Sequence, residues 1–284
     1  MQRSRTRPSD TPTAAGRGAA GRGGAARGRG AGRRGAAGRG GAGPRGGAAR
    51  PGAARRGGGL PCRDVTAPGW LADTRTSYDT VAESYTDLLR DALANEPFQR
   101  GILLLFAELT RAAGDGPVAD VGCGPGRITG HLHSIGLDAF GVDLSPSMID
   151  IARRDHPHLR FEVGSMTDLD LADRSVAGLV AWFSLIHIPD DEVPAVLAHF
   201  HRVLRPGGPL LLGFHVGDES TLKTEGYGGH PMRVHVHRRP PGRVATWLRD
   251  AGFTVDAELL HHADEYRTGA FLFAHRRPEP TPQP

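Results

Sequence analysis

The chain has 284 residues, and its charge is divided unevenly along its length. Residues 1–64 hold 15 Arg, 19 Gly and two acids, so their net charge is +13. Since the whole chain has a net charge of +4, the other 220 residues carry −9. The only two cysteines, Cys62 and Cys123, form neither a disulfide framework nor a zinc-site spacing. No apolar run reaches the length of a membrane span, so we expect a soluble, cytoplasmic protein without membrane partners.

Residues 1–64 carry almost no large apolar side chains. They cannot bury enough surface to offset the entropy lost on ordering, so a disordered tail is predicted. Arg, Gly, Ala and Pro have GC-rich codons, which favours an over-extended start site in a GC-rich genome; a passive linker and a nucleic-acid tether remain alternatives. The tail has no Phe or Tyr to stack on bases, and it is not Ser-rich as a transit peptide would be. A second disordered tail is predicted over 278–284.

Residues 65–277 are long enough for one packed domain and short for two. Apolar periodicity predicts a helix over 77–94, and Pro97 suits the start of a second helix that ends at Gly114. The apolar run 101–107 within it is interpreted as a buried helix face. Strands are then predicted over 118–121, 139–142, 161–163, 176–181, 210–214, 253–260 and 266–274. Helices are predicted over 127–135, 145–155, 192–204 and 243–251, with 215–231 irregular.

Strands that alternate with helices of this length require crossover connections, which produce a parallel sheet with helices on both faces. The last two strands have only about five residues between them, so one must run antiparallel. The predicted fold is therefore α/β, with a Rossmann-like, mostly parallel seven-stranded sheet and a C-terminal antiparallel hairpin.

A glycine-rich turn follows the strand 118–121, with glycine at positions 122, 124 and 126. Only glycine accepts positive φ without strain and lets a ligand approach the backbone closely. Asp143 stands 17 residues after Gly126, at the end of the next strand, where an acid can bind both hydroxyls of a ribose. The alternative role for this segment is a helix N-cap, which we assign to Ser145.

The glycine spacing favours one nucleoside cofactor over another. A dinucleotide fold has the pattern G-x-G-x-x-G, and Arg127 stands where its third glycine would be. The sequence Asp120-x-Gly122-x-Gly124-x-Gly126 instead resembles the first motif of the class I S-adenosylmethionine-dependent methyltransferases. Three further segments resemble motifs of the family's small-molecule members: Tyr78–Tyr85 (Y-D-x-x-A-x-x-Y), Gly141–Met148 and Leu204–Gly208.

The resemblance implies S-adenosylmethionine as the cofactor and a role for each matching residue. Gly122 and Gly124 leave room for the methionine part. Asp120 orients its amino group through water, and Tyr78 reaches its carboxylate. Asp143 binds the ribose. Around the adenine, the implied residues are Leu144, Met148, Ser165 and Met166. Many members have an acid at the Ser165 position, for which Asp168 is a candidate substitute here.

The segment after the fourth predicted strand lies at the edge of the sheet where such folds bind ligands. Trp182 and Phe183 are expected to form an apolar wall beside the methyl group. His187 is the first candidate for a general base, because an unperturbed imidazole titrates near neutrality, and His215 is the second. No metal site is predicted, since His235 and His237 have no carboxylate or cysteine at ligand spacing. The Gly-rich loop 215–231 is predicted to cover the substrate.

The predicted function is methyl transfer from S-adenosylmethionine to a small-molecule acceptor by in-line displacement, in a monomer or homodimer. One alternative is an NAD(P)-dependent oxidoreductase, disfavoured by the glycine spacing and by the lack of a Tyr-x-x-x-Lys pair, since Lys223 is the sole lysine. The other is an RNA-binding or RNA-modifying protein that uses the basic tail, disfavoured by the acidic body.

Overall fold

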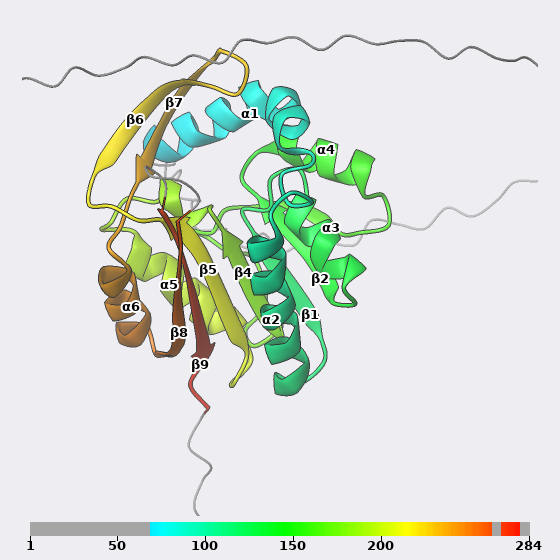
Figure 1. Ribbon diagram of the computed structural model, residues 1–284, viewed down its shortest axis with the longest axis vertical. Coiled ribbons are helices and arrows are strands. Elements are labelled where there is room, and N and C mark those ends of the chain that lie inside the picture. The colour runs from blue at the N-terminus through cyan, green and yellow to red at the C-terminus, as the bar shows by residue number, and fades with distance from the viewer. Residues whose placement is uncertain (1–68, 263–267, 279–284) are drawn as a thin grey trace, which may run out of the picture. The chain divides into compact units, whose positions relative to one another are not determined.

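The computed structural model of the protein describes residues 69–262 and 268–278 (Figure 1). The chain divides into two units, Met1–Pro61 and Cys62–Pro284, and every described residue belongs to the second. The predictions made for the basic tail and for the last residues of the chain therefore fall outside the described ranges.

A seven-stranded sheet forms the centre of the second unit, with the strand order β3-β2-β1-β4-β5-β9-β8. The first five strands in this order pair in parallel, and β9 runs antiparallel to both of its neighbours. The strands are β1 (Pro117–Val121), β2 (Asp138–Asp143), β3 (Phe161–Val163), β4 (Gly178–Trp182), β5 (Pro209–His215), β8 (Phe253–His262) and β9 (Thr268–Arg276). The predicted α/β fold with its C-terminal antiparallel hairpin is confirmed.

Both faces of the sheet are covered, and β4 shows how. All five of its residues are buried, and successive side chains point to opposite faces of a strand. Leu179 and Ala181 therefore belong to one apolar core, and Val180 and Trp182 to the other. The first core packs on α5 (Val193–Val203) and α6 (Pro241–Asp250), the second on α2 (Pro97–Ala113) and α3 (Arg127–Ser134).

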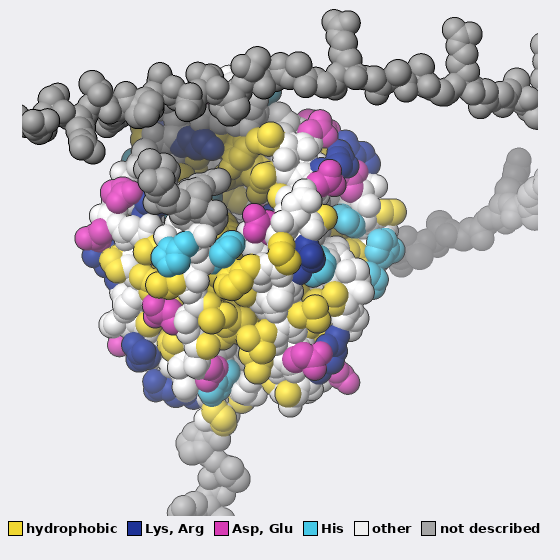
Figure 2. All heavy atoms as spheres, in the orientation of Figure 1, with side chains coloured by type: hydrophobic (Ala, Val, Ile, Leu, Met, Phe, Trp, Pro, Cys, Tyr) yellow, Lys and Arg dark blue, Asp and Glu magenta, His cyan; other side chains and the backbone are white. Residues whose placement is uncertain are grey.

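Helix α2 begins at Pro97 and is followed by Gly114, as predicted. Its apolar run is not wholly buried, however: Ile102 and Phe106 are covered, whereas Leu104 and Leu105 are 46% and 44% exposed. A run of consecutive apolar residues must face all sides of a helix with 3.6 residues per turn, so part of it reaches the surface, where Figure 2 shows apolar side chains over α2. Among the described residues, no helix combines the length and apolar character needed to cross a membrane.

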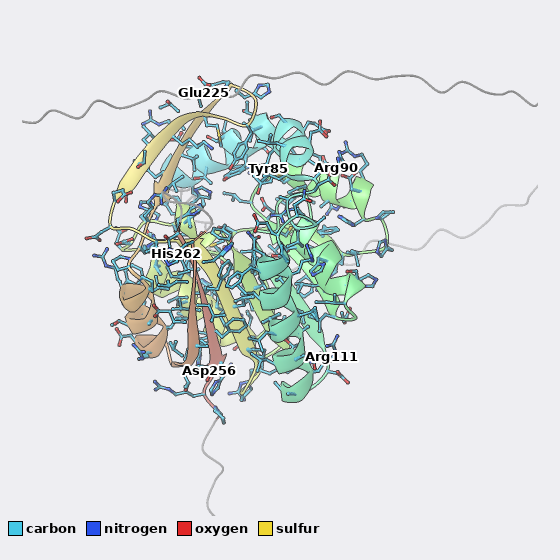
Figure 3. The ribbon with its side chains drawn as sticks, in the orientation of Figure 1. Tyr85, Arg90, Arg111, Glu225, Asp256 and His262 are labelled. Atoms are coloured by element: carbon cyan, nitrogen blue, oxygen red, sulfur yellow. The ribbon has the colours of Figure 1, made fainter. Side chains whose placement is uncertain are left out.

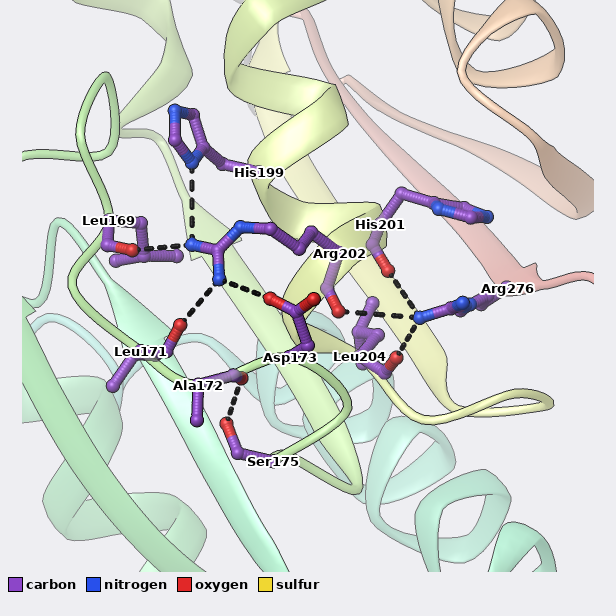
Figure 4. Close-up of polar contacts among 10 residues, drawn as sticks. All are labelled: Leu169, Leu171, Ala172, Asp173, Ser175, His199, His201, Arg202, Leu204 and Arg276. Atoms are coloured by element: carbon purple, nitrogen blue, oxygen red, sulfur yellow. Dashed lines mark hydrogen bonds and ion pairs between the residues drawn. The ribbon is translucent and has the colours of Figure 1, made fainter.

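Two arginines form hydrogen bonds between the carboxyl end of α5 and other parts of the domain (Figure 4). Arg276 Nη1 donates to the carbonyls of His201 (2.9 Å) and Leu204 (2.7 Å), two acceptors at the end of the helix. Arg202 Nη2 donates to the carbonyl of Leu169 at 2.6 Å, in the connection that leads to β4. These bonds connect the end of α5 to β9 and to the segment that precedes β4.

A separate antiparallel hairpin, β6 (Ser220–Gly226) and β7 (His230–His237), follows β5. The prediction that 215–231 is irregular is therefore wrong over 220–226 and 230–231. Every residue of β6 is exposed or half-buried, so the strand has no alternating apolar pattern to reveal it. The hairpin packs on α1 (Gly69–Leu89), which begins earlier and ends earlier than predicted. In Figure 1, α1 and the hairpin lie together beyond the end of the sheet.

Candidate active site

A cavity lies between α1 and the carboxyl ends of the parallel strands. The space within its walls, including its open mouth, is about 740 Å³. Its lining contains every predicted cofactor residue except Asp120, together with the catalytic candidate His187. The full lining is Trp70, Leu71, Thr74, Arg75, Tyr78, Tyr85, Gly122, Gly124, Asp143, Leu144, Ser145, Met148, Gly164, Ser165, Met166, Trp182, Phe183, Ser184, His187 and Ile188.

The three glycines of the turn after β1 all adopt left-handed backbone conformations, with φ of 78°, 55° and 81° at Gly122, Gly124 and Gly126. They are needed for different reasons. A Cβ at Gly122 would lie 2.2 Å from the Cβ of Ser184, and one at Gly126 would lie 2.8 Å from the ring of Phe161. A Cβ at Gly124 would have no neighbour closer than 4.0 Å. Gly124 is therefore the position where the absence of a side chain leaves open space for a ligand.

Asp143 lies at the end of β2, and both of its carboxylate oxygens face backbone donors. Oδ2 accepts from the N–H of Gly124 at 2.7 Å, and Oδ1 from the N–H of Ser145 at 2.9 Å. Burial raises the pKa of this carboxyl, and the two N–H bonds oppose that effect. The Ser145 hydroxyl accepts from the N–H of Met148 at 3.1 Å, so it caps α4 (Pro146–Asp155), as predicted, and it donates to Asp79 at 2.6 Å.

Asp120 is fully buried behind the glycine turn and does not line the cavity. Its Oδ2 accepts from the hydroxyl of Thr129 at 2.7 Å, and its Oδ1 has no hydrogen-bond partner among the described residues. Burial raises its pKa to about 7. An unpartnered buried oxygen next to the turn is suited to a polar ligand group reached through water, and the contact expected with the amino group stays a prediction.

His187 joins α1 to the hairpin through both ring nitrogens. Nδ1 lies 2.8 Å from the carbonyl oxygen of His235, and Nε2 lies 2.7 Å from the hydroxyl of Tyr78. Because a carbonyl only accepts, Nδ1 carries the hydrogen and Nε2 accepts from the Tyr78 O–H, an assignment made from the bonding pattern. Burial lowers the pKa of His187 to about 4, so the imidazole is neutral at pH 7.

Two aromatic rings, those of Trp182 and Phe183, line the cavity at the end of β4. Trp182 packs on Phe271 with ring centroids 4.9 Å apart, and Phe183 adopts a left-handed φ of 53°, a strained conformation for a bulky residue. His215 packs against Phe183, with centroids 4.9 Å apart, and does not line the cavity. The structure therefore gives no support to His215 as a second catalytic base.

The predicted adenine side of the cavity holds Leu144, Met148, Ser165 and Met166. The Ser165 hydroxyl is already bonded to the hydroxyl of Thr167 at 2.7 Å. Asp168 is exposed and lies outside the cavity lining. Its suggested use as a substitute acid at this edge is therefore not supported.

Sequence reasoning missed the first two turns of α1, which contribute Trp70, Leu71, Thr74 and Arg75 to the lining. Trp70, Thr74 and Tyr78 are four residues apart, which places them on one face of a helix. This four-residue spacing indicates that the helix face extends back to Trp70, whereas the predicted helix begins only at residue 77.

Arg239 was also missed, because a lone arginine after a strand carries no pattern. Its side chain is 1% exposed. The guanidinium donates to the carbonyls of Leu185 (3.0 Å) and Ile188, and it pairs with Asp190 at 2.9 Å. It thereby fixes the short 3-10 helix η1 (Leu185–His187), which carries His187 into the site.

A second cavity adjoins the first one and shares Trp70, Thr74 and His187 with it. It encloses about 870 Å³, including open solvent, and the hairpin supplies His235 and His237 to its wall. The two imidazole rings stack with centroids 5.9 Å apart. In the part of the chain that the structure describes, no group of three or more His, Cys, Asp or Glu side chains is arranged to hold a metal ion.

Residues 118–208 match a family model described as a methyltransferase domain. The chain is 30% identical over 202 residues to N-demethylindolmycin N-methyltransferase from Streptomyces griseus, an alignment that covers 67% of this chain and 81% of that protein. The chain belongs to the class I S-adenosylmethionine-dependent methyltransferases. The resemblance noted in the sequence, and S-adenosylmethionine as the cofactor, are thereby confirmed, and the oxidoreductase and RNA-binding alternatives receive no support.

Two solved structures show the same fold as this methyltransferase. Magnesium protoporphyrin IX methyltransferase from Synechocystis PCC 6803 is 17% identical, with a TM-score of 0.57 over 74% of this chain and 99% of that one. The DhpI structure is 18% identical, with a TM-score of 0.59 over 74% and 98%. The chain spans 49% of another curated relative, an uncharacterized 37.1 kDa protein in transposon TN4556 of Streptomyces fradiae.

Proposed function

We propose that the first cavity holds S-adenosylmethionine and that the methyl group passes to a small-molecule acceptor in the second cavity. The observation that supports this most is the wall that the two cavities share, which includes His187 and Trp70. An acceptor can react in line only if it lies next to the methyl donor.

Each part of the first cavity suits one part of the cofactor. Asp143 accepts two hydrogen bonds from backbone donors and retains further lone pairs for ribose hydroxyls. Leu144 and Met148 offer an apolar surface to the adenine. The open space at Gly124 admits the methionine end, and the unpartnered Oδ1 of Asp120 lies behind it. The residues present therefore fit the cofactor.

When bound, S-adenosylmethionine supplies an activated methyl group, which a lone pair of the acceptor takes as the carbon–sulfur bond breaks and the electron pair returns to sulfur. The protein therefore has to align the acceptor and receive its proton, where it carries one. The Tyr78 hydroxyl has a single proton to donate, either to His187 or to a carboxylate. Donation to a carboxylate leaves Nε2 of His187 free to accept the proton of the acceptor.

The backbone carbonyl of His235 fixes the tautomer that this role requires, because it keeps the hydrogen of His187 on Nδ1. The carbonyl belongs to β7, so the hairpin sets the orientation of His187 as well as forming a wall of the acceptor cavity. The Streptomyces griseus relative is named for a small-molecule substrate, which supports an acceptor of that kind.

The proposal is tested by incubating the protein with S-adenosylmethionine labelled in its methyl group and a pool of small metabolites. We expect label to appear in a small-molecule product, and the His187→Gln variant to lose most of the turnover while it retains affinity for S-adenosylhomocysteine. Full turnover by this variant would exclude His187 as the proton acceptor. Label found only in protein or RNA would contradict a small-molecule acceptor.

A further inference from the structure

A third crevice adjoins the glycine turn and has no part in the proposed reaction. It encloses about 1090 Å³, including the space open to solvent, and it lies between the end of α1, the start of α2 and α3. Pro125 and Arg127, on either side of Gly126, form its wall towards the turn. Figure 3 shows Arg90 just past the carboxyl end of α1, beside α4.

Two nitrogen atoms in this crevice are buried without a partner. Nη1 of Arg127 and Nε2 of His131 are both inaccessible to solvent and have no hydrogen-bond partner among the described residues. Both side chains line the crevice, one turn apart on α3. Leaving a buried guanidinium donor unsatisfied is costly, so Nη1 of Arg127 in particular indicates a missing ligand group beside this crevice.

The charge of the crevice indicates the sign of that group. Arg90, Arg100 and Arg127 all line it, and of these Arg90 is paired with Asp87 at 2.8 Å. Arg100 donates its hydrogen bonds to main-chain carbonyls, which leave its charge uncompensated. Of the described residues that line the crevice, Asp155 is the one acid, and it is already paired with Arg154 at 2.8 Å. The crevice therefore has an excess of positive charge.

The lowered pKa of His131 is consistent with this excess of positive charge. Burial lowers the pKa of its imidazole, and the positive charges of Arg100 and Arg127 lower it further. A bound anion would offset both arginine charges and give Nε2 of the imidazole a partner.

We propose that this crevice is a binding site for a small dianion, of the phosphate or dicarboxylate class. Arg127 and His131 supply the buried contacts, and Arg90 and Arg100 supply charge at the rim. The site is separate from the cofactor cavity and does not depend on the proposed function.

The test is isothermal titration of the full chain at pH 7.5 with sodium phosphate and, separately, with sodium malonate, at constant ionic strength set by sodium chloride. We expect at least one of the two anions to bind, and the stronger of them to identify the ligand class. The Arg127→Gln variant should bind it about tenfold more weakly or worse, since each lost contact is a charge-assisted hydrogen bond. His131→Gln should weaken binding as well, and the imidazole signals of His131 should shift when the anion is added.

The matched control is Arg249→Gln, which removes the same charge from an exposed position on α6. It should bind the anion as the wild type does. If neither anion binds, or if the three variants bind equally well, the crevice is not an anion site. His131→Gln provides an independent test if Arg127→Gln fails to fold.

Discussion

The lowered pKa of the half-buried His187 gives a quantitative prediction about how stability depends on pH. Its pKa falls from 6.5 to about 4 in the folded protein because the ring is buried. The unfolded chain therefore binds a proton more readily than the folded chain as the pH falls below 6.5. Linkage requires the free energy of unfolding to decrease with falling pH over this window, and to stop decreasing below about pH 4.

The size of the effect follows from the two pKa values. Each unit of difference corresponds to about 1.4 kcal/mol. Relative to pH 7.5, His187 lowers the free energy of unfolding by about 1.4 kcal/mol at pH 5.5 and by about 2.5 kcal/mol at pH 4.5. His187→Gln removes this titrating group, so the variant should lose less stability over the same range by these amounts.

The measurement is urea unfolding of the wild type and His187→Gln at pH 7.5, 5.5 and 4.5. Comparing the two proteins at each pH cancels the titration of all other groups, including Asp120 and Asp143. The control is His158→Gln, the same substitution at an exposed histidine. This variant keeps His187, so it should retain the loss of stability that His187 causes. If the wild type and His187→Gln lose stability in parallel, the pKa of His187 is not lowered in the folded protein.

Three further substitutions test the packing around the site. Gly122→Ala should lower the free energy of unfolding in urea by about 3 kcal/mol, because its Cβ would meet Ser184 at 2.2 Å. Gly124→Ala should lower it by only about 1 kcal/mol and should mainly weaken S-adenosylhomocysteine binding in titration calorimetry. Equal losses of stability in the two variants would refute this distinction. Arg239→Met should destabilise the protein by about 3 kcal/mol, since it leaves η1 carbonyls unpaired, and an unchanged unfolding midpoint would contradict its structural role. Ser145→Ala should cost about 1 kcal/mol through the lost cap; a Ser145→Thr variant, which keeps the hydroxyl that bonds Asp79, should restore most of this loss.

Local sequence patterns were sufficient to predict the parallel part of the fold. The strand before Gly122 is a short buried run, and the glycines, Asp143 and Ser145 stand at fixed offsets from strand ends. Their roles follow from backbone geometry that a few residues determine. The structure places all of them at one edge of the sheet.

Contacts between distant segments were beyond such patterns. The hairpin β6–β7 packs on α1, more than 130 residues away in the chain, and the exposed residues of β6 give no periodic signal. His215 packs on Phe183, which has a left-handed φ, a conformation that no propensity predicts for a phenylalanine. The bonds of His187 to Tyr78 and to the His235 carbonyl likewise depend on tertiary packing.

The most direct test of the account is whether Asp143 binds the cofactor, measured by titration calorimetry with S-adenosylhomocysteine. The wild type should bind one molecule per chain, and Asp143→Asn should bind about tenfold more weakly or worse, because the ribose loses a charged acceptor. Asp168→Asn, the same change at an exposed position outside the cavity, should bind as the wild type does. Unchanged affinity in Asp143→Asn, or binding of NADH in place of S-adenosylhomocysteine, would contradict the proposed site.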